Sequence, residues 1–420
     1  MKTAGIVAEY NPFHNGHQYH IEETRKQTGA DYVIAVMSGD FVQRGAPAFL
    51  DKYERARAAL LGGCDLVLEL PVLYSCASAE FFSAGAVTLL HQLGVCDFLS
   101  FGSEEGNLSH LNRLTDILTE EPKDYKTALR FHLKSGLSFP AAREKALSEY
   151  LSGSGDICPE DFSSFLKGSN NILALEYLKA LKKLNSNITP ATVLRKTASY
   201  HDTELHEEIS SASAIRHHLL HNNSISGIEG SVPEATYRSI AAIIEDSRLN
   251  LPNLFPDLDA LTPYLHSTLL RDNNPELYLD WDKDLANRFK QLPLMTMSFT
   301  QIADRLKSRN VTHSRVHRAL LHYILGIRKE MFYNQFDRNP VPYARILGFR
   351  KESSSLLKEI NKNGSIPMIT KPASIHNLIS SEDEWVWDMD LAASRLYQSI
   401  QYTTFGRILP SAYERTPVII

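Results

Sequence analysis

The first hundred residues alternate between short apolar runs and longer amphipathic stretches. The apolar runs lack polar alternation, which is typical of strands buried on both faces of a parallel sheet. We expect such strands at residues 3–9, 32–38, 65–71 and 95–102. Helices are expected between them at 16–28, 51–61 and 79–93, each followed by a glycine. The pattern predicts an α/β fold with a Rossmann-like parallel sheet, whose ligands bind at the carboxyl ends of the strands.

Beyond residue 105 the pattern becomes mostly helical. Helices are expected at 108–119, 122–135, 138–151 and 171–184, a short β-like piece at 191–196 and another helix from Ser213. A length of 420 residues favours two domains. We place the first at 1–225, with a helical insertion at about 105–185, and a mostly α-helical C-terminal domain at 226–420.

Composition excludes several classes of protein. Hydrophobic residues make up 43% of the chain and charged residues 22%, as in ordinary globular proteins. The net charge of −5 excludes a basic coat over the whole chain, although a local basic patch remains open. The sequence contains no run of 18 apolar residues, so a membrane span is not expected. Glu9 breaks the first apolar stretch too early for a secretory signal. The scattered cysteines indicate reduced thiols in a cytoplasmic protein and no zinc site: Cys64, Cys76, Cys96 and Cys158.

The sharpest chemical signal is the sequence HNGH at 14–17, between the first strand and the first helix. A helix N-terminus presents free amides and positive dipole charge, and Gly16 lets an anion approach the backbone. His14 and His17 are three residues apart, so both can donate to phosphate oxygens. Such donors stabilise charge that develops during phosphoryl chemistry. The alternative is a helix start at which the two histidines only cap and pack.

A strand, HxGH and a helix in this order resemble the nucleotidyltransferase superfamily, which shares the signature with class I aminoacyl-tRNA synthetases. Longer segments resemble the bacterial tRNA(Met) cytidine acetate ligase family: GIVAEYNPFHNGH (5–17), VMSGDFVQRGAPA (36–48), DKYERARAALLGGCDLVLELP (51–71), FGSE (101–104) and PYARILGF (342–349). The resemblance implies an HxGH nucleotidyltransferase topology and an ATP-dependent ligase. Such an enzyme activates acetate to acetyl-adenylate and acetylates N4 of the wobble cytidine of elongator tRNA(Met), giving N4-acetylcytidine.

The resemblance also implies site residues. His14 and His17 are the catalytic pair, and Mg²⁺ is expected on the phosphates without a protein-ligated metal. The implied ATP contacts are Val7, Ala8, Glu9, Tyr10, Asn11, Pro12, Phe13, His14, Asn15, Gly16, His17, Gln18, Tyr19, His20, Gly102, Asn170 and Arg195. Asn171, next to Asn170, stays open as the contact instead.

Further candidates rest on the chemistry of their side chains. Arg44 and Lys52 flank the carboxyl end of the second strand and are candidates for the leaving pyrophosphate, unless they are solvated loop charges. Asp40, in the same loop, either accepts the proton of the cytosine amine or caps the turn. Ser211 and Ser213 are candidate phosphate ligands in a serine-rich stretch that also carries an arginine but no lysine.

An RNA partner requires a basic region on an acidic chain. Residues 302–351 contain eleven Lys or Arg and three Asp or Glu, a local charge of +8. The candidate tRNA contacts are Arg309, Arg315, Arg318, Arg328 and Lys329. Interleaved aromatic rings offer faces for unpaired bases: Tyr323, Phe332, Tyr333 and Phe336. The alternative is an amphipathic helix with a solvated cationic face.

Two other functions stay open from the sequence. An adenylyltransferase that acts on a small phosphorylated metabolite would use the same HxGH signature. A nucleotide-sensing RNA-binding protein without turnover would need an ATP site, but not both histidines.

Overall fold

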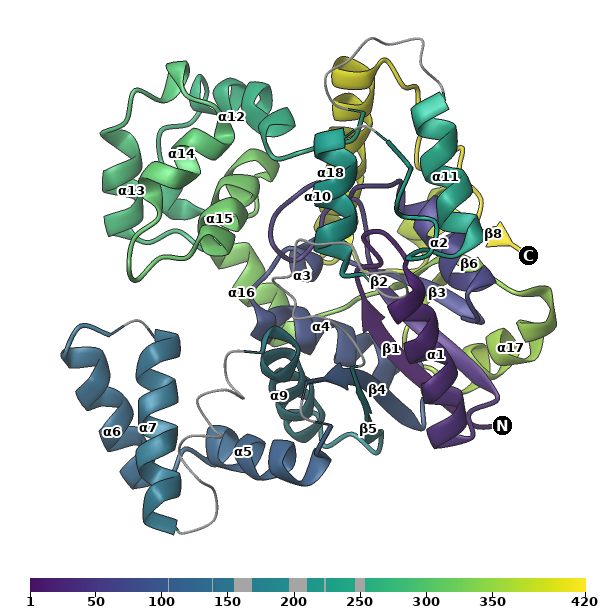
Figure 1. Cartoon of the computed structure of the whole chain (residues 1–420), viewed down its shortest axis with the longest axis horizontal. Coiled ribbons are helices and arrows are strands. Elements are labelled where there is room, and N and C mark those ends of the chain that lie inside the picture. The colour runs from purple at the N-terminus through teal and green to yellow at the C-terminus, as the bar shows by residue number, and fades with distance from the viewer. Residues whose placement is uncertain (105, 138, 155–167, 196–209, 223, 246–253) are drawn as a thin grey trace.

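The computed structural model describes residues 1–104, 106–137, 139–154, 168–195, 210–222, 224–245 and 254–420. These residues form one eight-stranded sheet covered by helices (Figure 1). The strands lie in the order β5-β4-β1-β2-β3-β6-β7, and β8 also pairs with β6. Their bounds are β1 (Thr3–Ala8), β2 (Tyr32–Ser38), β3 (Leu66–Leu70), β4 (Phe98–Ser103), β5 (Thr189–Leu194), β6 (Ala344–Phe349), β7 (Met368–Ile369) and β8 (Val418–Ile419).

The N-terminal strands confirm the predicted parallel sheet. β1 is parallel to β2 and β4, β2 to β3, and β4 to β5. In β2, Ile34 and Val36 pack into one hydrophobic cluster, whereas Val33, Ala35 and Met37 pack into another. Both faces of the strand are therefore buried, which explains why its sequence shows no polar alternation.

Three helices connect these strands where the pattern predicts them: α1 (Asn15–Thr28), α2 (Lys52–Leu61) and α4 (Ala79–Gln92). A further short helix that was not predicted, α3 (Val72–Ser75), follows β3. The predicted insertion contains α5 (Leu108–Glu120), α6 (Lys123–Lys134), α7 (Phe139–Ser154) and α9 (Ser169–Lys183). The hairpin of α6 and α7 projects from the body of the molecule (Figure 1). In contrast, α9 packs against α4 and β4, so its N-terminus lies beside the sheet.

The C-terminal half corrects the predicted division into domains. The predicted helical domain over 226–420 contributes β6, which is antiparallel to β3, together with β7 and β8. The pattern did not reveal β6 because Arg345 interrupts its apolar run; that side chain is buried and pairs with Glu69 of β3 at 3.1 Å. The boundary at 225/226 therefore does not separate the sheet from a second domain.

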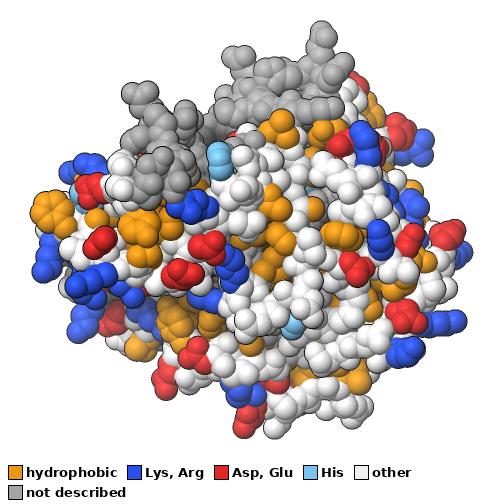
Figure 2. Space-filling model, turned by 90° about the horizontal axis from the view of Figure 1, so that it is seen from below, with side chains coloured by type: hydrophobic (Ala, Val, Ile, Leu, Met, Phe, Trp, Pro, Cys, Tyr) orange, Lys and Arg blue, Asp and Glu red, His pale blue; other side chains and the backbone are white. Residues whose placement is uncertain are grey.

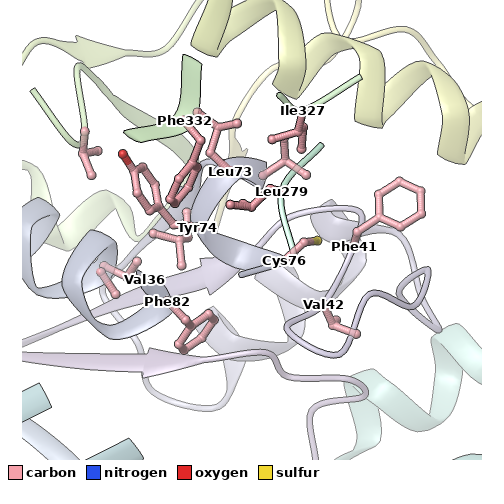
Figure 3. Packing of buried hydrophobic residues seen from close by; sticks show 14 of the residues in the cluster. Val36, Phe41, Val42, Leu73, Tyr74, Cys76, Phe82, Leu279, Ile327 and Phe332 are labelled. Atoms are coloured by element: carbon pink, nitrogen blue, oxygen red, sulfur yellow. The ribbon is translucent and has the colours of Figure 1, made fainter. Parts of the chain in front are cut away.

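The remaining helices are α10 (Ala212–Asn222), α11 (Glu234–Glu245), η1 (Asp259–Leu261), α12 (Thr262–Leu269), η2 (Pro275–Leu277), α13 (Lys283–Lys290), η3 (Leu294–Thr296), α14 (Phe299–Leu306), α15 (His313–Leu325), α16 (Lys329–Arg338), η4 (Lys351–Ser353), α17 (Ser354–Asn363), η5 (Pro372–Asn377) and α18 (Glu384–Phe405). The helices from η1 to α16 share a hydrophobic core with the sheet. Figure 3 shows Leu279, Ile327 and Phe332 of this helical part beside Leu73 and Tyr74 of α3. The helical part is thus fixed against the loops that follow β2 and β3.

The surface and the thiols agree with the composition. Figure 2 shows Lys and Arg side chains intermixed with Asp and Glu on the face seen from below. Cys64, Cys76 and Cys96 are free, and burial raises the pKa of each thiol to about 12. Cys158 lies outside the described residues. Across the described ranges, no helix combines the length and the apolar character that a bilayer crossing requires.

Candidate active site

A cavity of about 330 Å³ lies at the carboxyl ends of β1, β4 and β5. The first turns of four helices, α1, α4, α9 and α10, line it as well. The first amides of α1 and α9 are already paired: Asn15 and Gly16 donate to the Ser231 carbonyl and to His14 Nδ1, and Asn170 and Asn171 donate to the Glu104 carboxylate. The expected free amides are therefore not observed at these two helices, and α1 contributes mainly the partial positive charge of its dipole. The lining residues are Val7, Ala8, Glu9, Tyr10, Asn11, His14, Gly16, His17, Tyr19, His20, Gln43, Arg44, Ala79, Phe82, Phe101, Gly102, Ser169, Asn170, Ile172, Leu173, Tyr177, Val193, Leu194, Arg195, Ser211, Ala212, Ser213 and Arg216.

His14 and His17 both cap α1 and line the cavity. The Nδ1 atom of His14 accepts from the Gly16 amide at 3.1 Å, and Nδ1 of His17 accepts from the His14 amide at 3.2 Å. Because both Nδ1 atoms are acceptors, a neutral imidazole at either position carries its proton on Nε2. The two ring centroids are 3.7 Å apart. Each ring therefore uses its Nδ1 atom to cap the helix, as the alternative expected. The Nε2 atom of each ring remains as a donor toward a ligand.

The histidines of the cavity are held neutral. Burial, with a further contribution from Arg195 and Arg216, lowers the pKa of His14 to about 3. Burial and the neighbouring His14 lower the pKa of His17 well below its ordinary value. His20 has a pKa of about 4 because of burial and Arg195. At neutral pH these imidazoles are thus uncharged donors, and the positive charge of the cavity comes from arginine.

Arginine dominates the charge of the lining. Arg44, Arg195 and Arg216 line the cavity, and Glu9 is its one acidic residue among the described residues. Arg216 is held by the Asn11 carbonyl at 2.5 Å and the Ser213 hydroxyl at 3.2 Å. With neutral histidines, the lining carries a charge of about +2, which matches a polyanion such as a triphosphate. Arg216 is the arginine of the serine-rich stretch, which offered it in place of a lysine, although only Ser211 and Ser213 were proposed there as phosphate ligands.

The other side of the cavity is apolar. Phe82, Phe101, Leu173 and Tyr177 line it, and Phe101 packs against Tyr177 with ring centroids 5.8 Å apart. At Gly102 a Cβ would lie 3.4 Å from the Arg195 side chain, an ordinary contact distance, so the packing of the protein alone does not require glycine at this position. These aromatic residues were missed because the sequence marks them only as core positions of a strand and two helices.

The structure brings most of the implied ATP contacts together and places others elsewhere. Pro12, Phe13, Asn15 and Gln18 do not line the cavity. Phe13 is fully buried, and Asn15 donates to the Gly230 carbonyl at 2.7 Å. Asn170 lines the cavity, while Asn171 is buried and accepts from the Glu104 amide at 3.0 Å. The placement favours Asn170 over Asn171.

Among the further candidates, Arg44, Ser211 and Ser213 line the cavity, whereas Asp40 and Lys52 do not. Lys52 is 3% exposed, and its ammonium donates to Glu69 at 2.7 Å and contacts Asp40 at 2.9 Å. These partners turn the lysine into the interior, away from the cavity. This placement corrects two expectations. Lys52 does not reach the site of the leaving pyrophosphate, and Asp40 does not reach the cavity to accept the proton of the cytosine amine.

The predicted tRNA contacts differ in exposure. Arg309 and Arg328 are exposed, and Arg315 and Lys329 are partly exposed. Arg318 is only 7% exposed, because α15 turns it inward to Asp280, with Nε 2.8 Å from the carboxylate. Two of the predicted stacking rings are core residues: Tyr323 and Phe332. Arg318 and these two rings are therefore not accessible to RNA in this structure.

We expect the free energy of unfolding to fall as the pH is lowered from 6.5 toward 4. The folded pKa of His20 lies near 4 and the ordinary value is 6.5, so the unfolded chain binds more protons in this interval. Each such histidine contributes a slope of up to about 1.4 kcal/mol per pH unit, and its contribution is complete above pH 6.5. Urea denaturation at pH 7 and pH 5 should show a smaller loss in His20→Asn than in the wild type. Equal losses would contradict a buried neutral His20.

Comparison with known proteins extends this picture. A family model described as HIGH Nucleotidyl Transferase matches residues 1–407. The tRNA(Met) cytidine acetate ligase of Caldanaerobacter subterraneus subsp. tengcongensis is 42% identical over 407 residues, 97% of each chain. The Clostridium tetani enzyme of the same name is 40% identical over 94% of this chain and 95% of its own.

Two solved structures of Thermotoga maritima TmcAL cover 100% of both chains. The apo form has a TM-score of 0.92 at 32% identity, and the form bound with alpha-thio ATP has 0.89 at 31%. The chain therefore belongs to the HIGH nucleotidyl transferase family, among the tRNA(Met) cytidine acetate ligases.

Proposed function

We propose that this chain is an ATP-dependent tRNA acetate ligase, which activates acetate as acetyl-adenylate and acetylates N4 of the wobble cytidine of elongator tRNA(Met). The product is N4-acetylcytidine. One observation carries the proposal: two imidazole donors and three arginines line a single cavity at the starts of four helices. That arrangement suits a triphosphate, and the relatives named for this reaction match nearly the whole chain.

The first half-reaction is a displacement at phosphorus. A carboxylate oxygen of acetate attacks the α-phosphorus of ATP, the bond to the β-phosphate oxygen breaks, and pyrophosphate leaves. His14 and His17 donate from Nε2 to the reacting phosphate, so its oxygens meet donors that need no reorganisation. Arg44, Arg195 and Arg216 hold the remaining phosphates. Phe82, Phe101 and Tyr177 form the apolar side for the adenosine.

A metal ion has few protein ligands in this cavity. Glu9 is the one carboxylate of the described lining, and it accepts from the Gln43 amide at 2.9 Å. No group of three or more His, Cys, Asp or Glu within the described ranges is arranged to hold a metal. A Mg²⁺ bound with the nucleotide would neutralise part of the phosphate charge, and Glu9 is the lining carboxylate that would be near it.

The second half-reaction joins the acetyl group to RNA. The exocyclic amine of cytosine attacks the carbonyl carbon of acetyl-adenylate, AMP leaves, and the amine loses one proton. The exposed or partly exposed cations Arg309, Arg315, Arg328 and Lys329 approach the tRNA backbone, which makes binding dependent on salt. From a tRNA substrate we infer that the enzyme works in the cytoplasm.

The activation step is tested by ATP–pyrophosphate exchange without RNA. We expect label from pyrophosphate to enter ATP only when acetate is present, because acetate alone completes the reversible first step. A panel of small phosphorylated metabolites replaces acetate as the control. Exchange with a phosphorylated metabolite instead of acetate would support an adenylyltransferase and contradict the proposal. Mass spectrometry of elongator tRNA(Met) after full turnover should then show one added acetyl group on one nucleoside.

A further inference from the structure

A second, smaller cavity of about 190 Å³ lies next to the candidate active site. Both cavities are lined by the first turn of α4. Ser78 and Phe81 face the smaller one, whereas Ala79 and Phe82 face the larger one. A helix with its side chains is about 10–12 Å across, so the two cavities are separated by a distance that a few nucleotides of unstacked RNA can span.

The smaller cavity has an aromatic wall. Tyr333 of α16 is 45% exposed, and one side of its ring packs edge-to-face on Phe81 with centroids 5.9 Å apart. Phe81 in turn packs on the buried Phe332 at 4.9 Å, so Tyr333 rests on a fixed aromatic base. A supported ring that is still half exposed is suited to stack with a planar group, as bases do in RNA-binding sites.

Two cations lie beside this ring. Arg315 and Lys329 line the cavity together with Asp280. Arg315 is anchored by the Asp280 carbonyl at 3.1 Å and by Asp282 at 2.8 Å, and Lys329 by the Glu276 carbonyl at 2.7 Å.

The charge balance of this cavity favours an anion. The Asp280 carboxylate is neutralised by the buried Arg318, and the Asp282 carboxylate offsets Arg315. Lys329 therefore supplies the net positive charge. The hydroxyl of Ser78, the N-cap of α4, makes no capping bond, so the positive end of this helix, which both cavities share, is not occupied by its own cap. A phosphate therefore fits beside the aromatic ring.

We propose that this cavity binds one nucleotide of the RNA substrate, a neighbour of the cytidine that is acetylated. Its base stacks on Tyr333, and its phosphate meets Arg315, Lys329 and the N-terminus of α4. The site would hold the RNA while the target base enters the larger cavity. This inference rests on the proposed function, because it takes tRNA as the substrate.

The test compares Tyr333→Leu with Tyr333→Phe, which keeps the ring, and with Tyr402→Leu, a change at another exposed tyrosine (60% exposed) on α18. We expect Tyr333→Leu to raise the KM for tRNA about tenfold, since a base–aromatic stack contributes on that scale, and Tyr333→Phe to stay near the wild type. Acetate-dependent exchange reports on the ATP cavity, which Tyr333 does not line. An equal loss of that exchange in Tyr333→Leu would overturn the proposal, because the ring would then support the fold rather than the RNA.

Substrates lacking one base sharpen the test. An abasic nucleotide on one side of the target cytidine should cost the wild type about tenfold, and should cost Tyr333→Leu nothing further at that position. Equal costs in both enzymes at each flanking position, or an unchanged KM in Tyr333→Leu, would refute the nucleotide site. Absence of exchange and acetylation in the wild type would instead refute the proposed function, so the two failures are distinguishable.

Discussion

His17→Ala is expected to lower acetate-dependent ATP–pyrophosphate exchange by about a hundredfold or more. The change removes a donor whose direction is fixed, because its Nδ1 is occupied by the His14 amide at 3.2 Å and its proton therefore lies on Nε2. Loss of one such pre-placed donor to a transition-state oxyanion costs about two to three orders of magnitude in rate. Since the donor acts on the reacting phosphate, the loss should fall mainly on kcat rather than on the KM for ATP.

Gln18→Ala is the matched control on the same helix. Gln18 belongs to the implied ATP contacts, but in the structure it pairs with Glu22 at 3.1 Å and does not line the cavity. We expect its exchange rate to stay within about twofold of the wild type, as for other surface substitutions. A near-normal rate in His17→Ala, with Gln18→Ala also normal, would remove the imidazole from the mechanism.

The sequence predicted the parallel half of the fold closely because each element there follows one rule. Unbroken apolar runs become buried strands, and a glycine such as Gly29, in the left-handed conformation at φ 64°, ends the helix before it. The antiparallel strand β6 was missed because its apolar run contains an arginine. That residue is acceptable inside only because Glu69 lies on the neighbouring strand, and such a pairing over 276 residues is not visible in a local pattern.

In the candidate site, residues at the ends of predicted strands could be located from the sequence, whereas several residues on helices could not. The HNGH sequence, the loop before it and Gly102 lie at the ends of predicted strands, so strand order alone brings them together. Arg216 and Tyr177 come from helices whose rotation about their axes decides which side chains reach the cavity. Arg318 shows the converse, because the charge pattern of α15 alone could not reveal that Asp280 pairs with this arginine and keeps it turned inward.

Lys52→Met is expected to lower the free energy of unfolding by about 3–5 kcal/mol, because removing one partner of a buried ion pair leaves an uncompensated charge inside. Burial alone would lower the pKa of Lys52, but the Asp40 and Glu69 carboxylates raise it above its ordinary value. The ammonium also donates to Ser394 of α18 at 2.8 Å. Methionine has a similar length, so the loss reflects charge more than a cavity. Arg345 still pairs with Glu69 in this variant, so the buried Asp40 carboxylate is the charge that loses its ion-pair partner.

Urea denaturation followed by tryptophan fluorescence measures this effect, with Lys26→Met as the matched control. The Lys26 side chain is 77% exposed and its pair with Glu23 lies on the surface of α1, so we expect a change within about 0.5 kcal/mol. Adding Asp40→Asn to Lys52→Met should restore part of the loss, because the unpaired charge is then removed. Wild-type stability of Lys52→Met together with a raised KM for ATP would contradict the buried pair and return the lysine to the nucleotide site.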